Sequence, residues 1–207
     1  MKKYVFAEID MRNDFADDPR AVLPVPGTYA IVGKMAVLEK NASSIIIAAD
    51  THELDDPVSK DEFKSFPPHC VPGTWGWNRI PGLTRFEEGD LRITKNSYDT
   101  WKGMIGEGVE APVAKLIMRK FKNVDTIVVG GIVTGICVKA FMDGAIERGL
   151  SRAKKLIVIT DCVANLDIDG VPKTEDLFNE WDTAGAKLMT YEEFVNEYFT
   201  PFPRRTE

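Results

Sequence analysis

The chain has 207 residues, enough for one domain whose core needs no disulfide. It is 44% hydrophobic and 28% charged, which excludes disordered, collagen-like and coiled-coil proteins. Its net charge of −6 repels a phosphate backbone, so we expect no nucleic-acid partner. No apolar run approaches the roughly 20 residues of a membrane helix, and none near Met1 suits a signal peptide. We therefore expect a cytoplasmic protein that does not bind membranes.

Short apolar runs alternate with stretches of helical spacing along the chain. In chain order, the first half predicts a strand at 4–9, a helix over 29–40, and strands at 44–49 and 91–95. The second half predicts a helix over 109–121, a strand at 126–129, a helix over 136–148, a strand at 156–160, a helix over 174–184, a strand at 187–190 and a helix over 191–198.

Two segments lack both the short apolar runs of strands and the apolar spacing of helices. Residues 51–89 are rich in Pro, Gly, Asp and aromatic residues and predict a long loop, which in a compact domain is usually functional. Residues 199–207 predict a C-terminal tail. The alternation of strands and helices predicts one α/β domain over 1–207, with three α/β/α layers around a mainly parallel sheet, in a Rossmann-like arrangement.

Polar side chains follow the predicted strands at the points where the strands end. Asp10 closes the first strand, Asp50 and His52 follow the second, Lys95 closes the third and Cys137 follows the fourth across a turn. Ligands of open α/β sheets bind beyond the carboxyl ends of the strands. We therefore expect these five residues to meet in one site.

Asp10, Lys95 and Cys137 offer the parts of a cysteine hydrolase. Lys95 ends a buried strand, where its charge needs a partner, and Asp10 is the candidate. Cys137 begins a predicted helix, whose N-terminus should lower the thiol pKa and whose N–H groups could hold an oxyanion. The alternatives are that Asp10 only closes a turn, and that Cys137 is a buried structural thiol, as we expect of Cys70 and Cys162. A phosphate loop is a weaker alternative, because the glycine spacing matches no nucleotide-binding motif.

Asp50, His52 and His69 suggest a divalent metal site, to which Glu62 could add a fourth ligand. His52 and His69 are the only histidines of the chain, and both fall in the long loop. The alternatives are that the histidines are incidental and that Glu62 is a solvated acid. We expect one divalent ion, with zinc ahead of iron or manganese, and no organic cofactor.

These residues stand in a set of motifs that follow one another along the chain. The motifs are Asp10-x-x-x-Asp14-Phe15, Asp50-x-His52, Phe66-Pro-Pro-His69-Cys70-Val71-x-Gly73-Thr74, Lys95-x-x-Tyr98 and Gly131-Ile132-Val133-Thr134-x-x-Cys137-Val138. Together they resemble the isochorismatase-like cysteine hydrolases, and within them the nicotinamidase/pyrazinamidase branch, over about residues 4–190. The resemblance implies an isochorismatase-like fold.

The resemblance also implies a catalytic triad of Asp10, Lys95 and Cys137. The implied activity is hydrolysis of nicotinamide to nicotinate and ammonia through a thioester, which is a step of NAD salvage. It further implies a cis peptide bond between Ile132 and Val133, next to backbone N–H groups that hold the oxyanion. The expected partner is a small-molecule amide, and we expect a homo-oligomer.

The remaining residues that the resemblance implies form a binding pocket. Metal ligands are Asp50, His52 and His69, joined in some members by an acid seven residues before the last histidine, which is Glu62 here. Aromatic side chains around the substrate ring are Phe15, Phe66 and Tyr98.

Four positions depart from the nicotinamidase pattern. Gly135-Ile136 stand where Asp and then an aromatic residue or His are common, and Arg12 stands where a neutral residue such as Gln is usual. Glu8 falls in a strand expected to be buried, where its charge needs a partner. The departures permit a related amidohydrolase that acts on another small amide. A less favoured alternative is a non-catalytic metal- or nucleotide-binding α/β module.

Overall fold

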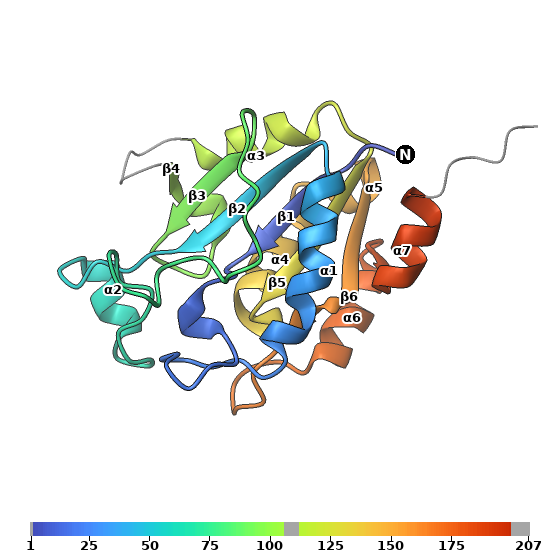
Figure 1. The fold of residues 1–207 in the computed structure, drawn as a ribbon. Coiled ribbons are helices and arrows are strands. Elements are labelled where there is room, and N and C mark those ends of the chain that lie inside the picture. The colour runs from blue at the N-terminus through green and yellow to red at the C-terminus, as the bar shows by residue number, and fades with distance from the viewer. Residues whose placement is uncertain (1, 106–111, 200–207) are drawn as a thin grey trace, which may run out of the picture.

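The computed structural model describes residues 2–105 and 112–199. One sheet lies between two layers of helices (Figure 1), which confirms the predicted three-layer α/β/α class. The helices are α1 Thr28–Asn41, α2 Pro57–Glu62, α3 Val113–Phe121, α4 Lys139–Glu147, α5 Leu150–Ala153, α6 Thr174–Thr183 and α7 Tyr191–Tyr198. None of the helices in the described residues is long and apolar enough to cross a membrane.

The sheet has the strand order β4-β3-β2-β1-β5-β6-β7 within the described residues. All neighbouring strands pair in parallel except the short β4, which pairs with β3 in the antiparallel sense. The strands are β1 Val5–Ile9, β2 Ser44–Asp50, β3 Leu91–Lys95, β4 Met104–Ile105, β5 Thr126–Ile132, β6 Lys155–Ala164 and β7 Lys187–Met189.

Alternate residues of the central strands face opposite helix layers. Tyr4 and Phe6 pack with α1 and α7, whereas Val5 and Ala7 pack with α3, α4 and α6. Figure 1 shows α1 in front of the sheet and α3 and α4 behind it. Because both faces are covered, the central strands are mostly apolar, as their sequences predict, and Glu8 in β1 is a buried charged exception.

The expectation that residues 51–89 form only a loop is wrong, because α2 lies within them. Pro57 occupies the first helical turn, where its missing N–H costs nothing, and the Asp56 side chain accepts a hydrogen bond of 2.8 Å from the Ser59 N–H. Both signals are present in the sequence. The short β4 and α5 also lie outside the predicted elements.

Other boundaries move by a few residues. The helix expected over 136–148 is an α-helix only from Lys139, because residues 134–138 form a π-helical turn. The strand expected at 156–160 extends to Ala164. The helix expected from 109 is described from Val113, and residues 109–111 lie outside the described residues, as do 200–207 of the expected tail.

Glu8 has an ion-pair partner, Arg79, which accounts for a charge inside the sheet. The Arg79 Nε donates to Glu8 Oε1 over 2.8 Å, and Arg79 Nη2 also bonds the Glu8 and Glu39 carboxylates. Glu39 lies on α1, so the three side chains join β1, α1 and the segment after α2. Burial and the adjacent Glu8 carboxylate raise the pKa of Glu39 far above its ordinary value.

Candidate active site

The carboxyl ends of four neighbouring strands bring the predicted site residues together. Asp10 directly follows β1, Asp50 ends β2 and Lys95 ends β3, with Asp50 and Lys95 paired in register. Cys137 lies in the π-helical turn that follows β5. Since β3, β2, β1 and β5 are adjacent in the sheet, residues far apart in the sequence meet at one edge.

Lys95 lies at the centre of this group. Its Nζ is 2.7 Å from Asp10 Oδ2, 2.9 Å from Asp50 Oδ1 and 3.5 Å from Cys137 Sγ. The other Asp10 oxygen, Oδ1, accepts a hydrogen bond of 2.9 Å from the Asp50 N–H. Lys95 and Asp10 are fully buried. A carboxylate, an ammonium and a thiol therefore share a site from which water is excluded.

The protonation of these groups follows from their burial and their charges. Burial alone would lower the pKa of Lys95, but Asp10 and Asp50 raise it well above its ordinary value, so Lys95 is charged. Burial raises the pKa of the Asp10 carboxyl. Burial also raises the pKa of the Cys137 thiol well above its ordinary value, although Lys95 acts in the opposite direction. The expectation that the helix N-terminus lowers this thiol pKa is therefore wrong, because the sulfur is almost fully desolvated.

The backbone around Cys137 has an unusual course. The peptide bond between Ile132 and Val133 is cis, which agrees with the sequence-based expectation. The Val133 carbonyl accepts hydrogen bonds from the N–H groups of Ile136 and Val138, over 3.0 and 3.1 Å. At Gly131 the φ of 132° and the approach of β1 both require glycine, since a Cβ would lie 2.1 Å from the Ile9 carbonyl oxygen.

Four possible metal ligands converge beside the triad. Asp50, His52, Glu62 and His69 each present a donor atom, and these atoms lie within 4.8 Å of one another. The Nε2 atoms of His52 and His69 are 3.0 and 3.2 Å from Asp50 Oδ2, and 3.8 and 3.6 Å from Glu62 Oε1. Glu62 comes from the end of α2, which the sequence did not predict as a helix.

The outer contacts of the histidines point their Nε2 atoms into the cluster. His52 Nδ1 lies 3.2 Å from Ser59 Oγ, and His69 Nδ1 lies 2.9 Å from the Pro67 carbonyl oxygen. Such contacts orient metal-binding imidazoles in proteins. Burial and the nearby Asp50 carboxylate raise the pKa of Glu62. Two imidazoles and two carboxylates, of which Asp50 is buried, therefore suit one divalent cation such as zinc, iron or manganese, whose charge would offset the repulsion between the acids.

The three predicted aromatic residues line one small pocket that opens onto Cys137. Phe15, Phe66 and Tyr98 share this inner pocket, of about 30 Å³, with the possible metal ligands Asp50, Glu62 and His69. Its remaining walls are Leu23, Val133, Ile136 and Leu166. Val133 was expected beside the oxyanion and Ile136 was noted as a departure, whereas Leu23 and Leu166 were not predicted from the sequence. Leu166 follows β6, so the same carboxyl-end rule could have indicated it.

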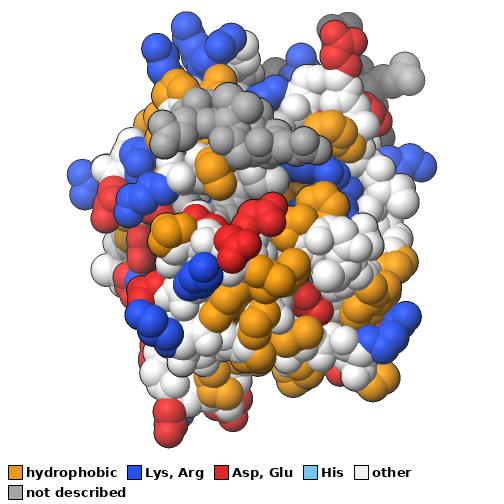
Figure 2. Space-filling view, turned by 90° about the vertical axis from the view of Figure 1, so that its left-hand side faces the viewer, with side chains coloured by type: hydrophobic (Ala, Val, Ile, Leu, Met, Phe, Trp, Pro, Cys, Tyr) orange, Lys and Arg blue, Asp and Glu red, His pale blue; other side chains and the backbone are white. Residues whose placement is uncertain are grey.

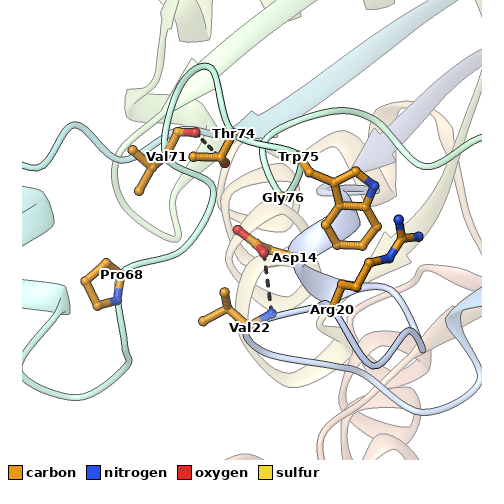
Figure 3. A pocket seen from close by; sticks show the side chains of 8 residues that line it. All are labelled: Asp14, Arg20, Val22, Pro68, Val71, Thr74, Trp75 and Gly76. Carbon is orange, nitrogen blue, oxygen red and sulfur yellow. Dashed lines mark hydrogen bonds between the residues drawn. The ribbon is translucent and has the colours of Figure 1, made fainter.

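Asp14, whose role the sequence left unassigned, fixes the segment that carries His69. Its Oδ2 accepts a hydrogen bond of 2.7 Å from the Cys70 N–H, and its Oδ1 accepts one of 3.4 Å from the Val22 N–H. A Cβ at position 76 would lie 2.0 Å from the Asp14 carboxylate, so only glycine fits there. Figure 3 shows Asp14 in a separate pocket, on the side of the segment where Arg20 stacks on Trp75.

Comparison with protein families gives one match that spans the chain. Residues 6–193 match the family model described as the isochorismatase domain. Apart from Val5 at the start of β1, the match includes the strands of the described sheet, and it includes all the residues of the predicted triad and all the possible metal ligands.

Known proteins resemble the chain over most of its length. A nicotinamidase/pyrazinamidase from Mycobacterium tuberculosis is 27% identical over 87% of this chain and 95% of its own. Two solved structures share the fold. N-carbamoylsarcosine amidase from Thermoplasma acidophilum has a TM-score of 0.67 at 24% identity, over 92% of this chain and 98% of its own. A pyrazinamidase from Pyrococcus horikoshii, solved with zinc, has a TM-score of 0.68 at 22% identity, over 91% of this chain and 99% of its own. This chain therefore belongs to the isochorismatase domain family and is an isochorismatase-like hydrolase.

Proposed function

We propose that this chain is a metal-containing cysteine amidohydrolase that converts nicotinamide and water to nicotinate and ammonia. The observation that carries the proposal is the position of Lys95 Nζ, 2.7 Å from Asp10 Oδ2 and 3.5 Å from Cys137 Sγ, beside the pocket that three of the four possible metal ligands line. With this activity the protein would serve NAD salvage.

The proposed reaction begins with proton transfer from the Cys137 thiol to the Asp10 carboxylate. The sulfur then attacks the amide carbonyl carbon, while backbone N–H groups near Val133 and Cys137 hold the oxyanion. Asp10 gives its proton to the departing nitrogen, so ammonia leaves and a thioester to Cys137 remains. Asp10 next takes a proton from water, the resulting hydroxide cleaves the thioester, and the thiol is restored. Lys95 remains protonated and stabilises the anionic form of each partner in turn.

Asp50, His52, Glu62 and His69 would hold the divalent ion. When bound, the ion supplies a Lewis-acidic position that binds and orients the substrate ring. Phe15, Phe66 and Tyr98 would hold that ring by stacking and exclude water from the thioester. The nicotinamidase/pyrazinamidase relative and the zinc-bound pyrazinamidase support this assignment.

A second candidate is an amidohydrolase that acts on another small amide. Gly135-Ile136, which depart from the common nicotinamidase residues, favour this reading, and the fold shared with N-carbamoylsarcosine amidase is consistent with it. Both candidates use the same triad and differ only in the acyl group that the pocket accepts.

Ammonia release from a panel of primary amides, nicotinamide and pyrazinamide included, tests the proposal on the metal-loaded protein. We expect turnover of nicotinamide, and loss of more than about a thousandfold in Cys137→Ala, because the covalent step is then impossible. Cys70→Ala and Cys162→Ala are the matched controls and should keep most activity, since the lining of the pocket includes Cys137 but neither Cys70 nor Cys162. Turnover of nicotinamide by Cys137→Ala would exclude the mechanism. If the protein releases ammonia from none of the amides and Cys137 resists alkylation, the result would favour a non-catalytic binding module.

A further inference from the structure

One carboxylate oxygen accepts three hydrogen bonds at the start of α2. Asp56 Oδ2 accepts from the Ser59 N–H over 2.8 Å, from the Ser59 hydroxyl over 3.0 Å and from Asn96 Nδ2 over 3.0 Å. Burial alone would raise the pKa of Asp56, but these hydrogen bonds lower it, so the carboxylate is charged. A charged carboxylate can only accept hydrogen bonds, and the proton in each of the three contacts therefore comes from the partner.

The hydroxyl of Ser59 has one proton, which it donates to Asp56. Ser59 Oγ also lies 3.2 Å from His52 Nδ1. Because a serine hydroxyl donates only once, Ser59 must accept in this second contact, and the proton between the two atoms belongs to His52 Nδ1. A neutral imidazole with its proton on Nδ1 has its free lone pair on Nε2. Asp56 therefore determines, through Ser59, which nitrogen of His52 is able to bind a metal ion.

A single turn of α2 contacts both nitrogens of the His52 ring. Ser59 and Glu62 are three residues apart, a spacing that places two side chains on the same face of a helix. Ser59 Oγ contacts Nδ1, while Glu62 Oε1 lies 3.8 Å from Nε2. The orientation of the His52 ring and the position of Glu62 are therefore fixed together.

The contact between Ser59 and His52 is shielded from solvent. Figure 2 views the molecule from the side on which α2 lies, and acidic and hydrophobic side chains are intermixed on this surface. Ser59 and His52 lie beneath the surface, since both are fully buried. An imidazole N–H that loses its acceptor at such a depth has no bulk water to replace it, so the Ser59 hydroxyl is costly to remove.

Asn96 connects the same carboxylate to the triad. Asn96 directly follows Lys95, the last residue of β3, and its hydrogen bond to Asp56 ties the start of α2 to the end of that strand. Asp56 thus joins the segment that carries two possible metal ligands to the strand that carries the triad ammonium.

We propose that Asp56 and Ser59 are positioning residues of the metal centre. Asp56 fixes the direction of the Ser59 hydroxyl, and Ser59 holds His52 with Nε2 directed at the ion. Both residues act through His52 and do not touch the substrate. The inference rests on the proposed metal-containing hydrolase and names two residues on which the affinity of its metal centre depends.

Zinc titration of the metal-depleted protein tests the role of Ser59. We expect Ser59→Ala to bind zinc at least about tenfold more weakly than the unmodified protein, because an outer contact of a metal-binding histidine is lost. Ser65→Ala makes the same substitution at an exposed position between Glu62 and His69 and is the matched control. Its zinc affinity should stay within about twofold of that of the unmodified protein.

A second pair of variants tests the charge of Asp56 and does not depend on the folding of Ser59→Ala. Asp56→Asn keeps a residue that caps helices well but removes the charge that fixes the hydroxyl proton. We expect it to weaken zinc binding by at least about threefold, since a charged acceptor is stronger than a neutral one. Asp55→Asn removes an exposed charge at the adjacent position and should leave the zinc affinity within about twofold.

Nuclear magnetic resonance of the zinc-loaded protein, labelled with ¹⁵N in histidine, gives a signature that general destabilisation would not produce. The chain has only two histidines, so each ring can be followed separately. We expect zinc on Nε2 and a proton on Nδ1 in both rings. In Ser59→Ala the Nδ1 proton of His52 should exchange with water at least about tenfold faster. The Nδ1 proton of His69, which is bonded to the Pro67 carbonyl oxygen, should be unaffected and serves as the internal control.

The outcomes separate this inference from the proposed function. Unchanged zinc affinity in Ser59→Ala, or zinc bound to Nδ1 of His52, would overturn the inference and leave hydrolysis of nicotinamide untouched. An equal loss of affinity in Ser65→Ala or Asp55→Asn would also overturn it, because the effect would not be specific to these contacts. The expected losses in a protein that releases ammonia from no amide would support the inference and overturn the function. A protein that neither binds zinc nor hydrolyses any amide would contradict both.

Discussion

Lys95 is the residue on which the electrostatics of the site depend, because it is a fully buried cation between two buried carboxylates. Two acids desolvated so close together would repel each other strongly without it. Cys137 contributes far less to this balance, since a thiol carries no charge while it is protonated. Substitution of Lys95 should therefore reduce both activity and stability, whereas substitution of Cys137 should reduce activity and leave stability nearly unchanged.

Lys95→Met should abolish amide hydrolysis and lower the free energy of unfolding by about 3–5 kcal/mol, the cost of breaking a buried ion pair from one side. Cys137→Ala should abolish hydrolysis as well, but change the free energy of unfolding by less than about 1.5 kcal/mol. Urea denaturation of both variants, with ammonia release from nicotinamide, measures the difference. Equal free energies of unfolding for the two variants would mean that the Lys95 charge is not needed to stabilise the buried carboxylates of Asp10 and Asp50.

Glu39 gives a pH-dependent contribution to stability. The single guanidinium of Arg79 bonds both buried carboxyl groups, those of Glu8 and Glu39. Burial and the adjacent Glu8 carboxyl group raise the pKa of Glu39 in the folded state above its ordinary 4.5. The unfolded chain loses this proton near pH 4.5 while the folded chain keeps it. The contribution of Glu39 to stability is therefore greatest below that pH and falls as the pH rises, by at most about 1.4 kcal/mol per pH unit.

In Glu39→Gln this loss of stability should disappear, because Gln stays neutral in both states. The free energy of unfolding of Glu39→Gln, relative to the unmodified protein, should rise between pH 5 and pH 9 in urea titrations. The exposed Glu147→Gln variant serves as the control and should follow the unmodified protein at each pH. A constant difference between pH 5 and 9 would show that Glu39 is ionised in the folded protein.

At the scale of elements, the possible metal ligands come from three segments that must be held together. Asp50 ends β2, Glu62 ends α2, and His69 lies on the returning segment that Asp14 fixes through the Cys70 N–H. The α2 helix has only six residues, and the Asp56 cap and Pro57 define its start. Such a short helix is not stable alone, so the position of Glu62 depends on the contacts of its segment.

Glu62→Ala should weaken metal affinity by at least about tenfold, because even the loss of an outer contact of a metal site costs about 10–100-fold. Hydrolysis should shift to higher added metal and be partly restored at saturation, since the triad is intact. Titration of the metal-depleted protein with zinc measures the affinity. Glu53→Ala, an exposed acid on the same loop, is the control. Superimposable zinc titrations of Glu62→Ala and the unmodified protein would remove Glu62 from the ligand set.

At the scale of the whole molecule, the site joins parts of the chain that the sheet alone does not hold. Lys95 contacts Asp50 through Oδ1, while His52 and His69 lie against the other oxygen of the same carboxylate. Asp50 therefore connects the triad to the metal-ligand cluster. A cation bound there would tie the segment 51–76 to the edge of the sheet and stabilise only the folded state.

Removal of the metal should lower the thermal midpoint of unfolding by about 5–10 °C. The estimate follows from about 2.7 kcal/mol of stabilisation at a hundredfold excess over the dissociation constant, in a protein of about 200 residues. Calorimetry before and after chelation gives the shift, and elemental analysis confirms that the metal is gone. Glu62→Ala should show a smaller shift. An unchanged midpoint in a protein shown to be metal-free would mean that the cluster does not bind the ion in the folded state.

The sequence by itself determined the layer architecture and the location of the site. Apolar periodicity is a local property, so the β1 and β2 strands and the α1 helix could be predicted within a few residues. The carboxyl-end rule then placed Asp10, Asp50, Lys95 and Cys137 at one edge, since parallel strands end together. The spacing of the motifs indicated the family, and the isochorismatase domain match confirms it.

Only the tertiary structure decided which groups pair and how deep they lie. Arg79 is 71 residues from Glu8 in the chain, and no local pattern could have identified it as the partner of that buried acid. The thiol pKa of Cys137 was predicted in the wrong direction, because the helix N-terminus is visible in the sequence whereas desolvation by the packed pocket is not. The approach of the loop after β6 to the Cys137 turn likewise depends on Gly135, since a Cβ there would lie 2.6 Å from Val171 Cγ1. Burial, charge pairing and cavity shape arise from contacts between distant segments, and these are fixed only when the chain has folded.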